Sequence, residues 1–377
     1  MKIAIIQPRT SYHVAGSEKV SIKHAEHLAR LGHSIDFYTS NPQGLEKSFL
    51  FKDFISTQNF KVNLLQFDIS NVVLGLYKQK PKLDHNRWIT ESFAFAGAIF
   101  ETLEQNKPDI ILSYYLPDGL FKPHGVTNIL YLSGYPSSSV PWYKACMPFF
   151  NATIAISAIV SNQWKENIGV GKDHFILGTG VDYPVAVKNK ITPKATSNLV
   201  FAGRLSERKG VLTLLDSFSK IIEKNNNVHL WILGDGDLYD RILEKCEQLM
   251  LSNHVTVTGI VENPQDYFTM ADICIFPSHK GDGLMGTVLE SMANGKPVIS
   301  TTKNGNEDVI TSGLNGILIE PNNVEELTLA IQNLLDNPKQ REILGKNAEL
   351  FIKENAVWEK NVIKLNTLLE KIQNKNN

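Results

Sequence analysis

Two acidic residues, Asp282 and Glu290, frame a glycine-rich segment whose residue types suit a ligand with phosphates and hydroxyl groups. Glycines surround the first of them, at Gly281, Gly283 and Gly286. A strand is expected over residues 273–276 and a helix over 287–294, so the glycines form a strand-to-helix loop. Such a loop presents backbone N–H groups to an anion, and a carboxylate accepts two hydrogen bonds from a vicinal diol of a sugar or a ribose. The alternative is an ordinary turn with Glu290 on a solvated helix face.

Two cations, Arg204 and Lys209, stand in a second loop of this kind, the segment 203–210 with the sequence GRLSERKG. It follows a strand expected over residues 199–202 and precedes an amphipathic helix. Two fixed cations there would stabilise the negative charge that grows on a departing diphosphate more than they stabilise the ground state. A solvated basic loop is the alternative.

A glycine pair, Gly234 and Gly236, follows the strand expected over residues 228–233. It is a weak signal for a dinucleotide, because the full Gly-x-Gly-x-x-Gly pattern is absent. A nicotinamide-dependent oxidoreductase is therefore a rival interpretation, against which the missing fingerprint and the cationic loop both weigh. A thermal-shift panel with nucleoside diphosphates and NAD would separate the two ligand classes.

Short apolar runs alternate with helical segments along the chain, which is typical of α/β proteins with parallel sheets. Strands are expected over residues 3–6, 35–38, 110–112, 129–132, 152–156, 199–202, 228–233, 255–257, 273–276 and 297–301. A helix begins near Glu18 after a loop that contains Gly16. A later helix has an expected apolar face of Phe93, Ala96, Phe100 and Leu103, and the last helix one of Trp358, Val362, Leu365, Leu369 and Ile372. The polar stretch 185–197 is expected to link two domains.

The composition is that of a folded protein of more than one domain. The chain has 377 residues, which corresponds to two or three domains of ~150 residues. Hydrophobic residues make up 42% and charged residues 20%, so the chain can bury a core. The formal net charge of −1 argues against a general nucleic-acid-binding protein. Cys146, Cys246 and Cys274 lack the paired spacing of a zinc site or a disulfide frame, which indicates a reducing compartment.

The N-terminal run MKIAIIQP is too short for a signal peptide, and no stretch reaches the ~20 apolar residues of a membrane helix. A cytoplasmic protein is therefore expected. A basic group with neighbouring aromatic residues consists of Tyr77, Lys78, Lys80, Lys82, Arg87 and Trp88. It could be a solvated surface loop. It could also contact anionic lipid or a phosphorylated acceptor, which leaves peripheral contact with the inner face of a membrane open.

The segment 271–301 resembles the family 4 glycosyltransferases, enzymes of the GT-B fold that transfer a sugar from a nucleotide diphosphate. The family frame is Pro-Ser…Glu-Gly-Phe-Gly…Leu-Glu-Ala-Met-Ala…Gly-Pro-Val-Ile. The matching residues are Pro277, Ser278, Gly283, Leu289, Glu290, Met292, Ala293, Gly295, Pro297, Val298 and Ile299. Two features differ, because Asp282 replaces the first Glu and Gly283-Leu284-Met285-Gly286 replaces Gly-Phe-Gly.

The resemblance extends more loosely over the rest of the chain. Residues 15–19 resemble the family's Gly-Gly-Ala-Glu-Lys loop and keep one of its glycines, Gly16. The resemblance implies two Rossmann-like parallel-sheet domains that face each other across a cleft. The N-terminal, acceptor-binding domain is expected over residues 1–190 and the nucleotide-sugar-binding domain over 191–355. The helix over 356–377 is expected to cross back to the first domain, and packing within the second domain is the alternative.

The resemblance also implies roles for single residues. Arg204 and Lys209 hold the diphosphate without a metal or other cofactor, and Glu290 takes the ribose hydroxyl groups. Asp282 holds the transferred sugar together with the loop and helix start, at Gly283, Leu284, Met285, Gly286 and Thr287. Ser133 stands where the family usually has a His that approaches the sugar, and a serine cannot carry a proton as imidazole does. The candidate catalytic residues are Asp282, Arg204, Lys209 and Ser133, and Gly16, Gly203 and Gly234 are expected to line the substrate site.

The resemblance therefore implies a retaining glycosyltransferase active in polysaccharide biosynthesis. It would move a hexosyl group from a nucleotide sugar to a glycan, lipid-linked or small-molecule acceptor, and it would bind no nucleic acid. The changes at Asp282 and Ser133 leave a second rival, a catalytically impaired GT-B protein that binds nucleotides or acts as a scaffold. A turnover assay distinguishes this rival from an enzyme.

Overall fold

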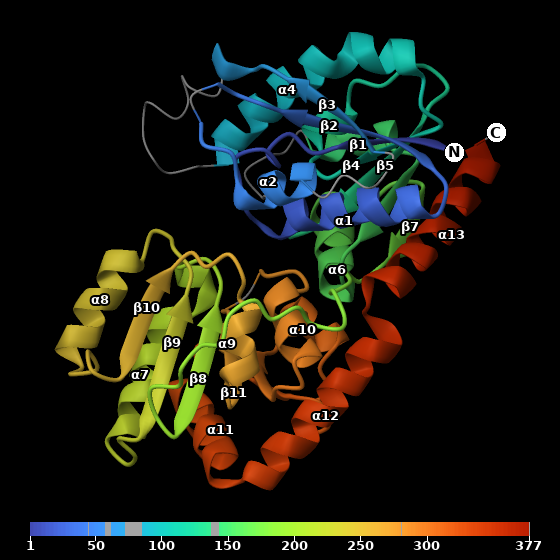
Figure 1. The fold of residues 1–377 in the computed structure, drawn as a ribbon. Coiled ribbons are helices and arrows are strands. Elements are labelled where there is room, and N and C mark those ends of the chain that lie inside the picture. Colours follow the sequence, from blue (N-terminus) through green and yellow to red (C-terminus); the bar gives the residue numbers. More distant parts are fainter. Residues whose placement is uncertain (44, 57–61, 72–84, 137–142, 280, 377) are drawn as a thin grey trace. The chain divides into compact units, whose positions relative to one another are not determined.

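The computed structural model describes residues 1–43, 45–56, 62–71, 85–136, 143–279 and 281–376, which form two compact units (Figure 1). Unit 1 comprises Met1–Gly178 and Glu359–Asn377, and unit 2 comprises Thr179–Trp358. Most of the basic group noted above lies outside the described residues: Tyr77, Lys78, Lys80 and Lys82, together with the side chains of Arg87 and Trp88.

Unit 1 is built on a seven-stranded sheet in which every neighbouring pair of strands is parallel. Across the sheet the strands are β3 (Val62–Phe67), β2 (Ser34–Ser40), β1 (Lys2–Ile6), β4 (Ile110–Ser113), β5 (Thr127–Leu132), β6 (Ala152–Ala155) and β7 (Asp173–Ile176). The helices of this part of the chain are α1 (Gly16–Arg30), α2 (Phe49–Ser56), α4 (His85–Asn106), α5 (Tyr143–Cys146) and α6 (Ala158–Asn167). The expected strands of this half are confirmed.

Helix α4 packs on the unit 1 core with a stripe that differs from the expected one. The buried stripe contains Phe95, Ile99 and Leu103. Residues four apart lie above one another along a helix, so these three form one face. Phe93 and Phe100 lie beyond its edge and are 37% and 36% exposed, so their expected place on the apolar face was wrong.

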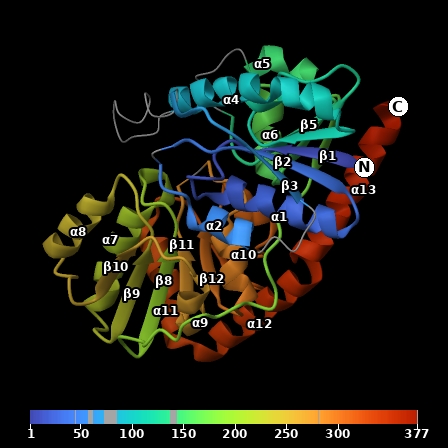
Figure 2. The same ribbon diagram turned by 45° about the horizontal axis from the view of Figure 1, so that its top comes forward.

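Unit 2 contains a six-stranded sheet that is also parallel throughout. Across it the strands are β10 (Val255–Gly259), β9 (Val228–Leu233), β8 (Ser197–Ala202), β11 (Ile273–Phe276), β12 (Val298–Thr301) and β13 (Ile317–Ile319). Helix α7 (Val211–Ile222) packs with α8 (Tyr239–Gln248) and α11 (Val324–Asp336), and α10 (Gly286–Ala293) packs with α9 (Gln265–Met270) and α12 (Pro338–Asn355) (Figure 2). Because helices cover the sheet, the central strands are apolar and buried along their length.

Both sheets reverse their strand order beside their first strand. In unit 2 the chain runs from β8 through β9 to β10 and then places β11 on the other side of β8. The loops that follow β8 and β11 therefore leave the sheet side by side. Unit 1 has the same reversal between β1 and β4. In open parallel sheets, ligands bind beyond the carboxyl ends of the strands at such a reversal.

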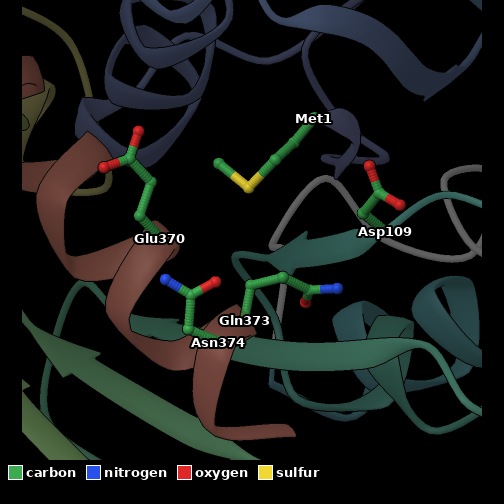
Figure 3. A pocket seen from close by; sticks show the side chains of 5 residues that line it. All are labelled: Met1, Asp109, Glu370, Gln373 and Asn374. Atoms are coloured by element: carbon green, nitrogen blue, oxygen red, sulfur yellow. The ribbon is translucent and has the colours of Figure 1, made fainter. Parts of the chain in front are cut away.

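The last helix, α13 (Trp358–Asn376), buries the apolar face expected for it. Asn361 Nδ2 donates a hydrogen bond to the Gly178 carbonyl at 2.7 Å, and Lys375 Nζ lies 2.6 Å from Asp173 Oδ1. Beside this helix a pocket of about 440 Å³ is lined by Met1, Asp109, Glu370, Gln373 and Asn374 (Figure 3). Met1 and Asp109 precede β1 and β4, so the pocket lies at the edge of the sheet opposite the loops that follow the strands. None of the helices described here is long and apolar enough to cross a membrane.

Candidate active site

The loop after β8 carries the predicted cations and is shaped by a glycine. Its centre is a single turn, η3 (Glu207–Lys209), and Gly210 follows with a left-handed φ of 70°. A Cβ at Gly210 would lie 1.9 Å from the Pro277 carbonyl oxygen, so only glycine fits there. This close approach brings η3 against the end of β11, where the second loop begins.

Two further glycines join this loop to the end of β9. A Cβ at Gly234 would lie 1.9 Å from the Gly203 carbonyl oxygen, and one at Gly236 would lie 2.4 Å from that of Leu205. The Leu205 N–H donates to the Asp235 carbonyl at 2.9 Å. The structure thus gives Gly234 and Gly236 a packing reason, the direct contact of two backbones, whereas a Cβ at Gly203 would meet only the Phe201 ring at an ordinary 3.5 Å.

Asp282 lies in the loop after β11 and is held by two cations from η3. Its Oδ2 atom is 3.0 Å from Lys209 Nζ, and its Oδ1 atom is 3.4 Å from Arg208 Nη1. The same Arg208 Nη1 donates to the Gly281 carbonyl at 3.0 Å. Burial opposes ionisation of Asp282, but Lys209, Arg208 and a Ser278 hydrogen bond together bring its pKa below the ordinary value. The carboxylate is therefore ionised at neutral pH.

Lys209 is the buried cation of the site, with a side chain only 13% exposed. Burial lowers its pKa, Asp282 raises it, and the nearby Arg208 and Arg204 lower it again. Arg204 is exposed at the start of the same loop. The structure thus brings together Arg204, Lys209 and Asp282, which lie far apart in the sequence. It adds Arg208, which the sequence analysis missed although it is the neighbour of Lys209.

Residues 304–306 support the Asp282 loop from behind. Asn306 Oδ1 accepts a hydrogen bond from the Met285 N–H at 3.1 Å, and the Gly305 N–H donates to the Asp282 carbonyl at 3.1 Å. A Cβ at Gly305 would lie 2.4 Å from the Leu284 nitrogen. Leu284 and Met285 are themselves buried, so their backbone, and not their side chains, is what a ligand could meet. The sequence analysis assigned no role to Asn306, for which its position in the turn after β12 was the only signal.

Helix α10 begins at the far end of this loop. Gly286 is its exposed first residue, and a Cβ there would have no atom within 4 Å. Among the described residues, no hydrogen bond uses the N–H groups of Gly286 or the half-buried Thr287. These donors at a helix N-terminus suit an anion. Glu290, one turn further on, is 7% exposed.

Gly16 and Ser133 belong to unit 1, where they follow strands of one sheet. Gly16 is exposed at the start of α1, with open space where a Cβ would stand. Ser133 is half-buried directly after β5. The next residue is fixed by a hydrogen bond of 2.8 Å from Trp164 Nε1 to the Gly134 carbonyl. These two candidates are thus placed at the carboxyl edge of the unit 1 sheet.

A buried polar cluster in unit 1 holds the loop before Gly16. Arg9 Nε lies 3.4 Å from Glu91 Oε2, and Arg9 Nη2 donates to Ser92 Oγ at 3.1 Å. The guanidinium also lies 4.2 Å from the centre of the Tyr115 ring, whose hydroxyl donates to Glu18 Oε1 at 3.1 Å. Sequence reasoning missed this cluster because its members are distant in the chain. Among the described residues, no group of three His, Cys, Asp or Glu side chains is arranged to hold a metal ion.

Comparison with known proteins identifies the family. A sequence model described as "Glycosyl transferases group 1" matches residues 187–351. An uncharacterized glycosyltransferase of Methanocaldococcus jannaschii, MJ1059, is 38% identical over 283 residues, which cover 66% of this chain and 69% of that protein. The lipopolysaccharide core biosynthesis glycosyltransferase LpsE of Rhizobium meliloti is 26% identical over 252 residues, or 66% of this chain and 72% of that one. The chain belongs to the group 1 glycosyl transferases.

The match to some relatives is shorter. This chain is 32% identical over 230 residues to MJ1069, another uncharacterized glycosyltransferase of M. jannaschii, and spans 58% of that protein's length.

Solved structures show the fold over nearly the whole chain. Sucrose-phosphate synthase of Thermosynechococcus elongatus has a TM-score of 0.78 at 18% identity, covering 98% of both chains. HepE of Anabaena, in complex with UDP and glucose, has a TM-score of 0.78 at 15% identity, covering 98% of this chain and 99% of that one. The predicted GT-B fold is confirmed.

Proposed function

We propose that this protein transfers a hexosyl group from a nucleoside-diphosphate sugar to a hydroxyl group of an acceptor, with retention of the anomeric configuration. The observation that carries the proposal is the cluster of Arg204, Arg208 and Lys209 next to the Asp282 loop that leads into α10, at the strand-order reversal of unit 2. Three cations and unpaired N–H groups form a site for a doubly charged anion. HepE, a protein of the same fold, was solved with UDP-glucose.

The residues of the unit 2 site have different roles in the proposed reaction, according to their charge. Arg204 and Lys209 bind the diphosphate and stabilise its growing charge as the bond between the sugar C1 and the phosphate oxygen breaks. The acceptor oxygen bonds to C1, and its proton passes to the departing diphosphate, so no imidazole is required. Glu290 accepts hydrogen bonds from the ribose, and Asp282 holds the sugar hydroxyl groups with the amides of the loop. Ser133 hydrogen-bonds a sugar hydroxyl from unit 1.

The acceptor is a glycan, a lipid-linked sugar or a small molecule, bound by unit 1. Relatives named for lipopolysaccharide core and capsular polysaccharide biosynthesis support a role in polysaccharide assembly. We place the activity in the cytoplasm, at the inner face of the membrane where the acceptor is lipid-linked. The formal net charge of −1 supports the proposal that the protein binds no nucleic acid. Because cations of the protein itself face the diphosphate, transfer needs neither a metal nor an organic cofactor.

The direct test is a screen of nucleotide sugars for release of nucleoside diphosphate, with acceptor pools from bacterial glycans and lipids. One donor should be turned over, turnover should persist in EDTA, and the anomeric proton of the product should show retention by NMR. Activity abolished by EDTA and restored by Mg²⁺ or Mn²⁺ would contradict the cationic-loop mechanism. An inverted product would contradict the retaining assignment.

One observation favours a second candidate, a GT-B protein that binds nucleotides without turnover. Asp282 is already paired with Lys209, and it is one methylene shorter than the Glu of the family frame, so the sugar site could be misplaced. About 1 Å of misplacement can cost roughly a hundredfold in rate. Tight binding of nucleoside diphosphate with no turnover of any donor would establish this alternative. A thermal shift with NAD and none with nucleoside diphosphates would instead favour an oxidoreductase.

A further inference from the structure

The Asp282 carboxylate occupies the cations that the proposed function assigns to the donor. Each of its oxygens faces a different cation, Oδ2 facing Lys209 at 3.0 Å and Oδ1 facing Arg208 at 3.4 Å. Its side chain is only 5% exposed, so water screens these pairs poorly. An incoming phosphate therefore meets Lys209 while that residue is already paired with an anion.

The pairing of Asp282 with Lys209 determines the order in which the diphosphate and the sugar can contact these two residues. Lys209 lies on η3 and Asp282 on the neighbouring loop, so the carboxylate bridges the two loops that form the site. Lys209 cannot give its full charge to a diphosphate while Asp282 Oδ2 holds it. Asp282 likewise cannot accept a sugar hydroxyl with that oxygen until Lys209 has turned away. Binding of the diphosphate and release of Asp282 for the sugar are thus one exchange.

We propose that Asp282 is an internal anion that holds Lys209 in the donor-free protein and is displaced from it by the donor's diphosphate. Arg208 is the positioning residue of this exchange. It forms an ion pair with Asp282 Oδ1 and donates a hydrogen bond to the Gly281 carbonyl, so it keeps the carboxylate and the glycine loop in place after Lys209 moves. The inference rests on the proposed function and adds to it a competition between two anions for Lys209. A ligand with the charge of a diphosphate displaces the carboxylate, and a neutral sugar does not.

The test is a calorimetric titration with inorganic pyrophosphate, which has the charge of the leaving group and no base or sugar. At pH 7, Asp282→Asn should bind pyrophosphate roughly tenfold more tightly than wild type, which is the size of one net charged hydrogen bond. Its turnover of the donor should fall, because the sugar loses its carboxylate. Asp282→Ala repeats the binding test without a side chain that can hydrogen-bond Lys209.

Glu207→Gln is the matched control. Glu207 lies in η3 beside Arg208 and pairs with the exposed Arg241, not with Lys209. The substitution removes one negative charge, as Asp282→Asn does, but from the neighbouring turn η3, so the affinity of Glu207→Gln for pyrophosphate should stay within about twofold of wild type. An equal gain in Glu207→Gln would mean that general charge, and not the Asp282–Lys209 pair, sets the affinity, and the inference would be overturned.

Measuring pyrophosphate affinity over a range of pH distinguishes competition between Asp282 and the ligand for Lys209 from a structural change caused by the substitution. Asp282 raises the pKa of Lys209, so removing it lowers that pKa further and Lys209 loses its proton at a lower pH. The gain of Asp282→Asn should therefore be largest near neutral pH and shrink as the pH rises. Arg208→Ala should lower kcat more than it changes KM, and Arg208→Lys should restore part of kcat.

The possible results distinguish a failure of the internal-anion inference from a failure of the proposed function. Wild-type protein that binds no pyrophosphate would overturn the diphosphate site, and the inference with it. Binding by wild type with unchanged or weaker binding by both Asp282 variants, each folded by its thermal midpoint, would overturn the internal-anion inference alone. Tighter binding with reduced turnover supports it.

Discussion

The two sheets place charged residues at the same topological point and use them differently. At the reversal of unit 2, the side chains of Lys209 and Arg208 are 13% and 53% exposed beside Asp282. At the reversal of unit 1, those of Arg9 and Glu91 are 0% and 1% exposed. The unit 1 pair is enclosed among Ser92 and Tyr115, whereas the unit 2 cations contact Asp282 in the loop that leads into α10. An ion pair that is enclosed by the protein stabilises the surrounding backbone, whereas cations that solvent can reach are also able to bind a ligand.

The difference follows from what surrounds each pair. In unit 2, glycines let the backbones of three loops touch, and the side chains of Glu207 and Arg208 in η3 remain exposed. In unit 1, α4 brings Glu91 and Ser92 over the loop after β1 and seals Arg9 beneath them. The contrast indicates an accessible charged site in unit 2, and a unit 1 cluster that keeps the loop after β1 rigid.

The largest expected effect is on the stability of unit 1. Arg9→Ala should lower the free energy of unfolding by about 3–5 kcal/mol, because Glu91 is left as a buried unpaired carboxylate. Urea denaturation measures it, with Lys52→Ala as control, since the Lys52–Glu46 pair is exposed and worth at most about 1 kcal/mol. A loss for Arg9→Ala no larger than that of the control would contradict the role as a brace. Pyrophosphate binding should survive wherever the variant remains folded.

The next effect is on the chemistry of unit 2. Arg204→Ala and Lys209→Ala should each lower turnover by ~10²–10³, the cost of one preorganised charge-stabilising group. The rate of nucleoside diphosphate release measures it at saturating donor. Lys220→Ala is the control, because Lys220 pairs with the exposed Glu325 on other elements of the same unit. Wild-type turnover in both site variants would remove these cations from the mechanism.

A smaller effect concerns the glycine contact that opens the unit 2 site. Gly210→Ala should destabilise unit 2 by about 2 kcal/mol or more, because its Cβ meets the Pro277 carbonyl in a left-handed conformation. Gly97→Ala, in the middle of α4 with open space around it, should instead stabilise by roughly 0.5–1 kcal/mol. Thermal unfolding compares the two. Equal effects of both substitutions would show that the close approach does not constrain residue 210.

The smallest effect is the pH dependence of the neutral histidines in unit 1. Burial lowers the pKa of His24 to about 3 and that of His174 to about 4. Below about pH 6.5 the unfolded chain gains protons that the folded unit does not, so stability falls as the pH falls toward these values. His174→Gln, placed between Thr153 and Ser161, should reduce the loss between pH 7 and pH 5 by on the order of 1 kcal/mol. An unchanged pH profile of the denaturation midpoint would contradict it.

The sequence predicted what depends on neighbours along the chain. Strand β11 was expected over residues 273–276 and spans Ile273–Phe276, because an apolar run between turn residues is a local signal. The loops with Arg204, Lys209 and Asp282 were recognised from glycine spacing. Their pairing was not, because the distance between Asp282 and Lys209 is fixed by the order β8–β11 and by Gly210, not by either loop alone.

Two further contacts could not be predicted from the sequence, because each joins residues that only the packing of the fold brings together. Arg9 meets Glu91 only because β1 and α4 pack together, and Asn306 meets Met285 only across β12. On α4 the spacing of Phe93 and Phe100 fitted a helical face, but a second apolar stripe faces the core. A helix with apolar residues on more than one face leaves the choice to the sheet beneath it.

The proposed function requires that the cations of the loop after β8 form a diphosphate site. Calorimetric titration of inorganic pyrophosphate into wild type and into the double variant Arg204→Ala/Lys209→Ala tests it without knowledge of the sugar, base or acceptor. We expect one site per chain in wild type and a loss of affinity of at least about a hundredfold in the double variant, the size of two charged hydrogen bonds. Equal affinity in both proteins, or no binding by wild type, would contradict it.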